Sequence, residues 1–172
     1  MIRPEKILVA YFVQKGKEAT SKSAAVARQA VDMLKAKGVD TDSFAITPVE
    51  EYPADEANLE LATKAERDSH ARPALVGKYS GMKDITGVML VSPNWWDSFP
   101  QAVFSFLDDY DFAQTRVVPV IVTRDDARNV RAQLRDFLGN WVLPGVDVKE
   151  DAASDASVRL SEAISQLFEP SK

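Results

Sequence analysis

The chain contains Val88-Met89-Leu90-Val91-Ser92-Pro93-Asn94-Trp95-Trp96-Asp97, an apolar run followed directly by a proline and two adjacent tryptophans. An apolar run of this length predicts a strand that is buried on both faces. Pro93 ends that strand, because proline has no N–H to give to a sheet ladder. Ligands of open parallel sheets bind at the carboxyl ends of the strands. The paired indoles therefore predict a site for a flat, conjugated ligand, and burial of both rings in the core is the alternative.

Strands and helices alternate along the rest of the chain. The strand described above covers residues 85–92, and further apolar segments predict strands at 6–12, 43–46, 117–122 and 146–148. Helical spacing of apolar residues predicts helices over about residues 20–38, 55–68, 98–109, 123–139 and 154–168. Ser98 has the form of a helix cap, and Asp55 is expected to start a helix in a polar surface excursion. Pro119 predicts a bulge or an unpaired residue within its strand.

This order predicts an α/β fold in one domain over residues 1–172. Five strands with right-handed crossovers favour a doubly wound parallel sheet of order 2-1-3-4-5, with helices on both faces in a three-layer sandwich. The loops after the first and third strands, residues 13–23 and 92–98, then meet where the strand order reverses. The loop of residues 123–128 lies beside them. The chain order alone thus predicts where a site lies.

Composition excludes several classes of function. The formal net charge of −5 argues against nucleic acid or an anionic membrane as the main partner. Because the chain has no cysteine and one histidine, His70, we expect no disulfide, no metal site and no Ser-His-Asp hydrolase. We expect no catalytic side chain and no membrane span, and we place the protein in the cytoplasm.

The loop of residues 13–23, after the first strand, leads into a helix. At the start of a helix, free backbone N–H groups and the helix dipole favour the binding of an anion. Gly16 permits a tight turn, while lysines and hydroxyls provide charge and donors. The sequence thus favours a phosphate site, although the hydroxyls equally fit a simple helix cap. The residues expected at the site are Gln14, Lys15, Gly16, Thr20, Ser21, Lys22 and Ser23.

Four segments together resemble the flavodoxin family, in particular its small FMN-binding flavodoxin-like proteins. Residues 6–12 are similar to the first strand of that group, and residues 52–55 with Glu66 and Arg72-Pro73 to the segment before its third strand. The segment 93–96 with Pro100 is similar to its second flavin loop. The block 102–112 is similar to the helix and turn beyond that loop, so the resemblance spans most of the chain.

The resemblance implies FMN as the cofactor, with its phosphate in the first loop and its isoalloxazine ring between two other loops. It implies an electron-transfer protein or a small oxidoreductase, for example of the NAD(P)H:quinone type, in which the flavin does the chemistry. The partner is then a redox protein or a small-molecule acceptor. The oligomeric state stays open, a homodimer included. The residues placed at the ring are Pro93, Asn94, Trp95, Trp96, Thr123, Arg124 and Asp125.

Two departures from the family pattern favour an alternative, a flavin-free binding or interaction module. The first loop lacks hydroxyls directly after Phe12, so Thr20, Ser21 and Ser23 take the phosphate role only if the loop carries an insertion. The negative charge of the Glu18 carboxylate repels a phosphate bound in this loop. The loop after Val122 lacks the family's glycines, and its acidic residues disfavour a negatively charged reduced flavin.

Overall fold

One parallel sheet organises the computed structural model, which describes residues 5–139 and 141–169. Its strand order, β2-β1-β3-β4-β5, confirms the predicted topology. β2 begins earlier than the sequence predicted, at Asp40. The strands are β1 (Lys6–Phe12), β2 (Asp40–Ile46), β3 (Gly87–Pro93), β4 (Arg116–Thr123) and β5 (Val146–Lys149).

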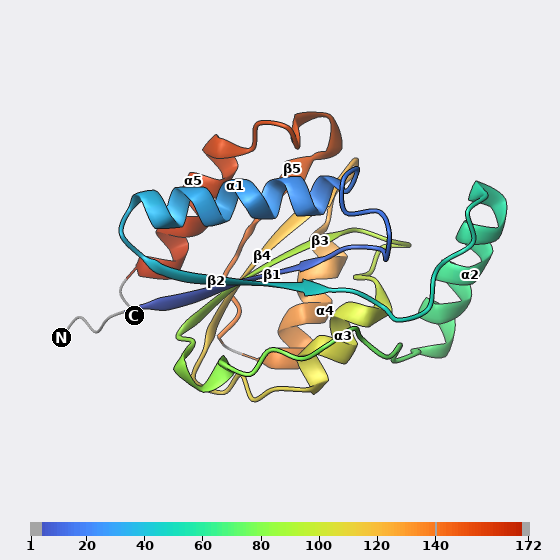
Figure 1. The fold of residues 1–172 in the computed structure, drawn as a ribbon, viewed down its shortest axis with the longest axis horizontal. Helices are drawn as coiled ribbons and strands as arrows, with labels where there is room; N and C mark the ends of the chain where they lie inside the picture. Colours follow the sequence, from blue (N-terminus) through green and yellow to red (C-terminus); the bar gives the residue numbers. More distant parts are fainter. Residues whose placement is uncertain (1–4, 140, 170–172) are drawn as a thin grey trace.

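Helices cover both faces of the sheet and give the predicted three layers (Figure 1). α1 and α5 pack on one face, and α3 and α4 pack on the other. The apolar run in β3 is buried on both faces of the sheet. Val88 and Leu90 belong to the core cluster on one face, and Met89 and Val91 belong to the cluster on the other. The helices are α1 (Lys22–Ala36), α2 (Glu56–Ser69), α3 (Gln101–Asp108), α4 (Arg128–Leu138) and α5 (Ser157–Phe168).

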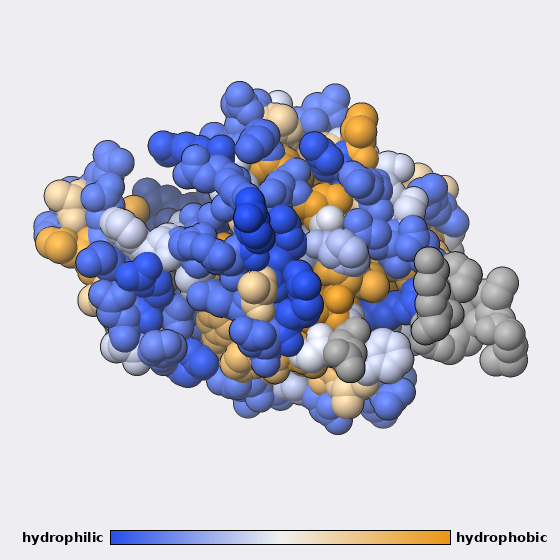
Figure 2. All heavy atoms as spheres, turned by 180° about the vertical axis from the view of Figure 1, so that it is seen from behind, coloured by the Kyte–Doolittle hydropathy of each residue, from blue (hydrophilic) through white to orange (hydrophobic). Residues whose placement is uncertain are grey.

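Helix α2 stands apart from these layers, beyond the carboxyl ends of the strands (Figure 1). Thr63 is its one buried residue, which confirms the expected surface excursion. Asp55 caps the helix as predicted, since its carboxylate accepts a 3.0 Å hydrogen bond from the Asn58 amide. Seen from behind, the surface of the molecule is mostly hydrophilic, with apolar residues in scattered areas (Figure 2).

The irregularity predicted at Pro119 is present on the β5 side of β4. Val117 forms an isolated bridge with Val142, but the regular ladder with β5 begins only at Val120. Gly145 fills the gap, and its backbone lies so close to Pro119 that a Cβ there would be 2.2 Å from the proline carbonyl oxygen.

Two predicted helix starts were wrong. Ser98 does not cap α3, which begins at Gln101 after Pro100, because Ser98 belongs to a tight turn and its hydroxyl donates to the Phe99 carbonyl. Helix α4 begins at Arg128 rather than near Thr123. Instead, a short loop precedes it. In this loop the Thr123 hydroxyl accepts a hydrogen bond from the Asp125 N–H, and the Asp126 carboxylate accepts one from the Arg128 N–H.

Candidate functional site

A cleft of about 560 Å³ lies at the carboxyl edge of the sheet, where the loops after β1, β3 and β4 face helix α2. The strand order brings these loops together, as expected. α2 supplies the opposite wall through Glu56, Leu59, Glu60 and Thr63. The sequence-predicted residues that line the cleft are Gln14, Asn94, Trp95, Trp96, Thr123, Arg124 and Asp125.

The tryptophan loop is a tight turn with an unusual backbone. The backbone groups of Trp95 and Ser98 exchange two hydrogen bonds, of 2.8 and 3.1 Å. Between them, Trp96 and Asp97 both lie in the left-handed region, with φ angles of 58° and 60°. A bulky residue seldom adopts this conformation, and the cost is of order 1–3 kcal/mol per residue. Strain of this kind persists only where the surroundings hold it, and such residues gather at functional sites.

Three contacts from flanking helices hold the turn in place. The indole Nε1 of Trp96 donates to Thr63 Oγ1 at 2.9 Å, and the Trp96 carbonyl accepts from Arg67 Nη1 at 2.8 Å, both on α2. From α4, Asn129 Nδ2 donates to the Asp97 carboxylate at 2.5 Å. The turn is thus clamped between α2 and α4.

The two indoles have different environments. Trp95 is half-buried and packs edge-on against Phe12 and Tyr52, with ring centroids 5.0 and 5.6 Å apart. Trp96 is 38% exposed and lines the cleft. Trp95 therefore supports the turn from the core side, while Trp96 offers an aromatic surface to a ligand.

Tyr52, which supports Trp95, is itself tied to α2. Its hydroxyl donates a 2.8 Å hydrogen bond to Glu66 Oε1. Burial, together with this carboxylate, raises the pKa of the Tyr52 hydroxyl well above its usual value. Burial also raises the pKa of Glu66, although the hydrogen bond from Tyr52 partly offsets it. Burial therefore makes ionisation of either group harder than it is in water.

Asn94 places a buried amide oxygen without a partner at the cleft. Its amide nitrogen donates to Thr123 Oγ1 at 3.4 Å, and its backbone N–H donates to the Val122 carbonyl at 3.3 Å. Its Oδ1 is buried and has no hydrogen-bond partner within residues 5–139 and 141–169. A buried acceptor of this kind is costly unless a donor reaches it. Pro93, the last residue of β3, precedes it outside the cleft lining.

The predicted phosphate loop lies at the same end of the sheet, because α1 begins where β1 ends (Figure 1). Ser21 caps α1 through a 3.0 Å hydrogen bond from the Ala24 amide, which is the capping role that the sequence left open. The backbone N–H groups of Lys22 and Ser23 have no hydrogen-bond partner in the described part of the chain. The helix start therefore keeps free donors for an anion.

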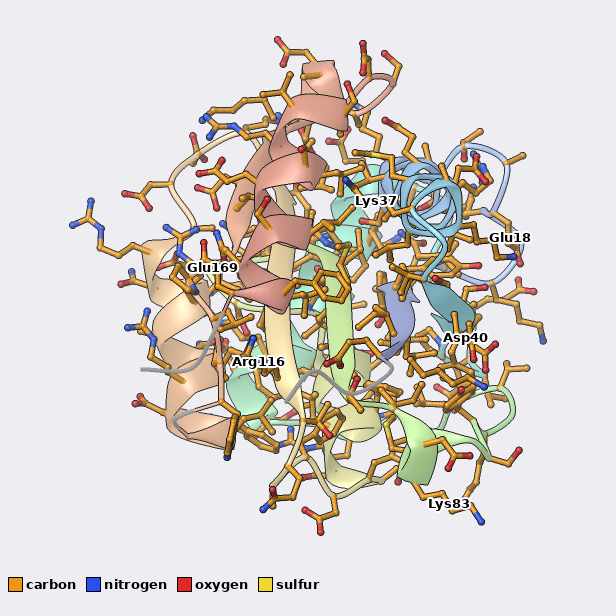
Figure 3. All side chains as sticks on the ribbon, turned by 90° about the vertical axis from the view of Figure 1, so that its left-hand side faces the viewer. Glu18, Lys37, Asp40, Lys83, Arg116 and Glu169 are labelled. Atoms are coloured by element: carbon orange, nitrogen blue, oxygen red, sulfur yellow. The ribbon has the colours of Figure 1, made fainter. Side chains whose placement is uncertain are left out.

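The rest of this loop is more exposed. Thr20 hydrogen-bonds to the Lys17 carbonyl, and Lys15 points to solvent. Gly16 has a φ of 79°, and its N–H donates to the Glu18 carboxylate at 3.4 Å. Glu18 lies at the surface (Figure 3). Of the predicted first-loop residues, Gln14 lines the cleft, and the others lie outside its lining.

The lining of the cleft is acidic. Arg124 reaches from the β4 loop to Glu150 at 2.6 Å, and Asp125 donates its backbone N–H to Thr123 Oγ1. Among the lining residues that the structure describes, Arg124 is thus the one basic residue, and it is paired with Glu150. The carboxylates are those of Glu56, Glu60, Asp97, Asp125 and Glu150.

Sequence reasoning missed the contribution of α2. Its polar composition indicated only an exposed helix, but Thr63 and Arg67 fix the tryptophan turn. One signal was available, since Thr63 and Arg67 stand four residues apart and so share one helix face. In residues 5–139 and 141–169, no helix has the length and apolar character to cross a bilayer, and no acidic or histidine cluster could hold a metal.

Comparisons with known proteins agree with this architecture. A family model described as Flavodoxin matches residues 6–159. A comparison with curated proteins found no match.

Three solved structures share the fold. A protein from Bacteroides uniformis, inferred to be a flavoprotein, is 24% identical, with 91% of this chain and 99% of that chain covered and a TM-score of 0.69. A flavoprotein from Lactobacillus acidophilus, in complex with FMN, is 12% identical, with the same coverage and a TM-score of 0.69. An NAD(P)H:quinone oxidoreductase from Methanothermobacter marburgensis is 12% identical over 99% of both chains, with a TM-score of 0.60.

Proposed function

This chain belongs to the flavodoxin family, and we propose on that basis that it binds FMN in the cleft beside Trp96. It then works as an electron-transfer protein or as a small FMN-dependent oxidoreductase. The family and the FMN complex of the Lactobacillus acidophilus neighbour support FMN as the cofactor. The observation that carries the proposal is the exposed Trp96 indole, held in a strained turn over the cleft.

The residues present fit this cofactor. The cleft volume of about 560 Å³ lies within the range of about 300–1,000 Å³ that is usual for small-molecule sites. The buried Asn94 Oδ1 needs a donor, and FMN carries several in its ring N–H and ribityl hydroxyls. The free amides at the start of α1 suit a phosphate.

Each group has a distinct role in the proposed site. FMN supplies one- and two-electron transfer when bound. Trp96 holds the ring plane by stacking, while Asn94 accepts a hydrogen bond and fixes its orientation. Lys22 and the amides of α1 bind the phosphate. The carboxylates of Glu56, Asp125 and Glu150 oppose any added negative charge, so they lower the reduction potential of the site.

The test is a fluorescence titration of the purified protein with FMN. Trp96→Ala should weaken FMN binding by about 1–3 kcal/mol, the range for an aromatic stacked on a base. Trp141→Ala is the matched control, because Trp141 is 40% exposed, close to the 38% of Trp96, but lies outside the cleft. Riboflavin, which lacks the phosphate, should bind more weakly than FMN.

Three outcomes decide the proposal. A loss of FMN affinity confined to Trp96→Ala supports it, provided that far-UV circular dichroism shows a folded variant. Equal titrations for both tryptophan variants overturn the assignment of the ring to this cleft. No quenching at micromolar protein overturns FMN binding altogether.

The second candidate is the flavin-free module, and two contacts favour it. The Glu18 carboxylate accepts the Gly16 N–H and brings a negative charge to the first loop, and the Arg124–Glu150 pair lies at the cleft. A protein that binds no FMN would support this candidate. Steady NADPH oxidation with a quinone would instead identify a reductase, whereas FMN binding without turnover favours electron transfer between proteins.

A further inference from the structure

A second hollow, of about 300 Å³, lies between the C-terminal end of α2 and helices α3 and α4. We call it the α3–α4 groove. It shares Arg67, His70 and Gln133 with a neighbouring hollow that extends to Trp96 and Asp97. The groove therefore lies beyond the tryptophan turn from the FMN cleft. Nothing in the proposed function uses it.

The groove has an aromatic floor. The rings of Phe104 on α3 and Phe137 on α4 are tilted by 56°, with centroids 5.3 Å apart. Phe137 is 37% exposed, so part of its ring is open to solvent at the groove. A planar ligand can cover this surface and remove it from water.

Arg72 forms one wall and is held rigidly in place. Its guanidinium lies 5.3 Å from the Phe104 ring centroid and 6.0 Å from that of Phe137. Its Nε donates to Asp108 at 2.9 Å, and its Nη1 donates to Gln101 Oε1 at 3.2 Å. A guanidinium fixed in this way loses little further freedom when it binds an anion.

The charge of the lining differs from that of the FMN cleft. In the described part of the chain, the groove is lined by two arginines, Arg67 and Arg72, and by one carboxylate, that of Asp136. The carboxylates that pair with these arginines, Asp68 and Asp108, lie outside the lining of the groove. The FMN cleft is instead dominated by carboxylates.

We propose that the α3–α4 groove binds a small aromatic anion, a planar ring that carries a carboxylate or sulfonate. The ring packs on Phe137, and the acidic group faces Arg72. Gln133 offers an amide donor beside it, whereas the amide nitrogen of Gln101 already donates to the Phe99 carbonyl at 3.4 Å. This site is separate from the FMN cleft and does not depend on bound FMN.

The test uses naphthalene-2-sulfonate as the probe, measured by calorimetry and by saturation-transfer NMR. The matched probes are naphthalene-2-methanol, which is neutral, and 2-naphthylmethylammonium, which is a cation. All three are titrated into the full chain without FMN and with FMN added. The sulfonate should bind most tightly in both series, and the cation should bind least.

Gln133 is exposed, so its side chain can be replaced by a charged one without disturbing the packing of the core. Gln133→Glu should weaken sulfonate binding by about threefold, and Gln133→Lys should strengthen it by a similar factor. Arg72→Gln should weaken it by about tenfold. Ser161→Glu, an exposed position on α5 across the sheet, is the control and should have no effect.

Several results would overturn the proposal. They are equal binding of the three probes, displacement of the sulfonate by FMN, or equal affinity in the Gln133→Glu and Gln133→Lys variants. Because the variants are measured without FMN as well, the site can be present even if the protein binds no flavin. Failure here likewise leaves the FMN titration intact.

Discussion

The indole Nε1 of Trp96 lies 2.9 Å from the Oγ1 of Thr63 and donates a hydrogen bond to it, which links the strained turn to helix α2. Thr63 is 8% exposed, and its hydroxyl in turn donates to the Leu59 carbonyl at 2.9 Å. The Thr63 hydroxyl thus accepts one hydrogen bond and donates another within the protein itself, without a ligand. The orientation of the indole, and with it one wall of the cleft, depends on a residue of the least buried helix.

Replacement of Thr63 by valine should therefore weaken FMN binding. Valine keeps the shape but removes the acceptor, so the indole N–H loses its partner, at a cost of about 1 kcal/mol or fivefold in affinity. Thr63→Ser retains the hydroxyl and serves as the control. Fluorescence titration with FMN measures both variants. Identical affinities for Val and Ser would show that Thr63 does not set the position of the indole.

Glu18 gives a prediction about the phosphate. Its carboxylate accepts the Gly16 N–H at 3.4 Å, so it occupies a donor of the first loop and adds a like charge. Glu18→Gln should tighten FMN binding by about threefold and leave riboflavin unchanged. The gain should shrink in 0.5 M salt, because exposed charges are then screened within about 3–5 Å. An equal gain for riboflavin would place the phosphate elsewhere.

The fold was predictable because its signals are local. An apolar run such as 88–91 can only be buried on both faces, and alternation of strands with helices leaves few topologies. Pro119 was equally informative, since its missing N–H required an interruption that the structure shows beside β5. The predicted starts of α3 and α4 were wrong because the local signal was ambiguous. Ser98 and Thr123 can each cap a helix or close a turn, and in the structure both close turns.

The site was predictable only in part. Asn94, Trp96 and Thr123 follow strand ends, so the topology placed them at one edge. The left-handed backbone of Trp96 has no sequence signal, because such strain is imposed by tertiary contacts. The wall made by α2 depends on how a polar helix docks, and hydrophobic periodicity carries no information on that.

Gly145 is expected to be indispensable for folding. It has a φ of 72°, and a Cβ there would lie 2.2 Å from the Pro119 carbonyl oxygen. Gly145→Ala should therefore lower the free energy of unfolding by more than about 3 kcal/mol, the scale of severe steric and backbone conflicts. Gly16→Ala is the control, since its φ of 79° is similar but nothing lies within 4 Å of the added Cβ. It should cost only about 1 kcal/mol. Urea denaturation measures both, and similar losses would contradict the close approach of Gly145 to Pro119.

Glu66 predicts how stability depends on pH. Burial raises the pKa of its carboxyl above the ordinary 4.5, so the folded chain holds this proton more tightly than the unfolded chain does. The associated stability is then present below pH 4.5 and is lost as the pH rises through the raised pKa.

Glu66→Gln keeps the acceptor for the Tyr52 hydroxyl but cannot ionise, so it avoids this loss. In urea denaturation, the free energy of unfolding of Glu66→Gln should rise relative to that of the wild type as the pH is raised above 4.5. Glu60→Gln, at an exposed position of the same helix, should follow the wild-type profile. Parallel profiles for wild type and Glu66→Gln would mean that the Tyr52–Glu66 contact carries no proton linkage.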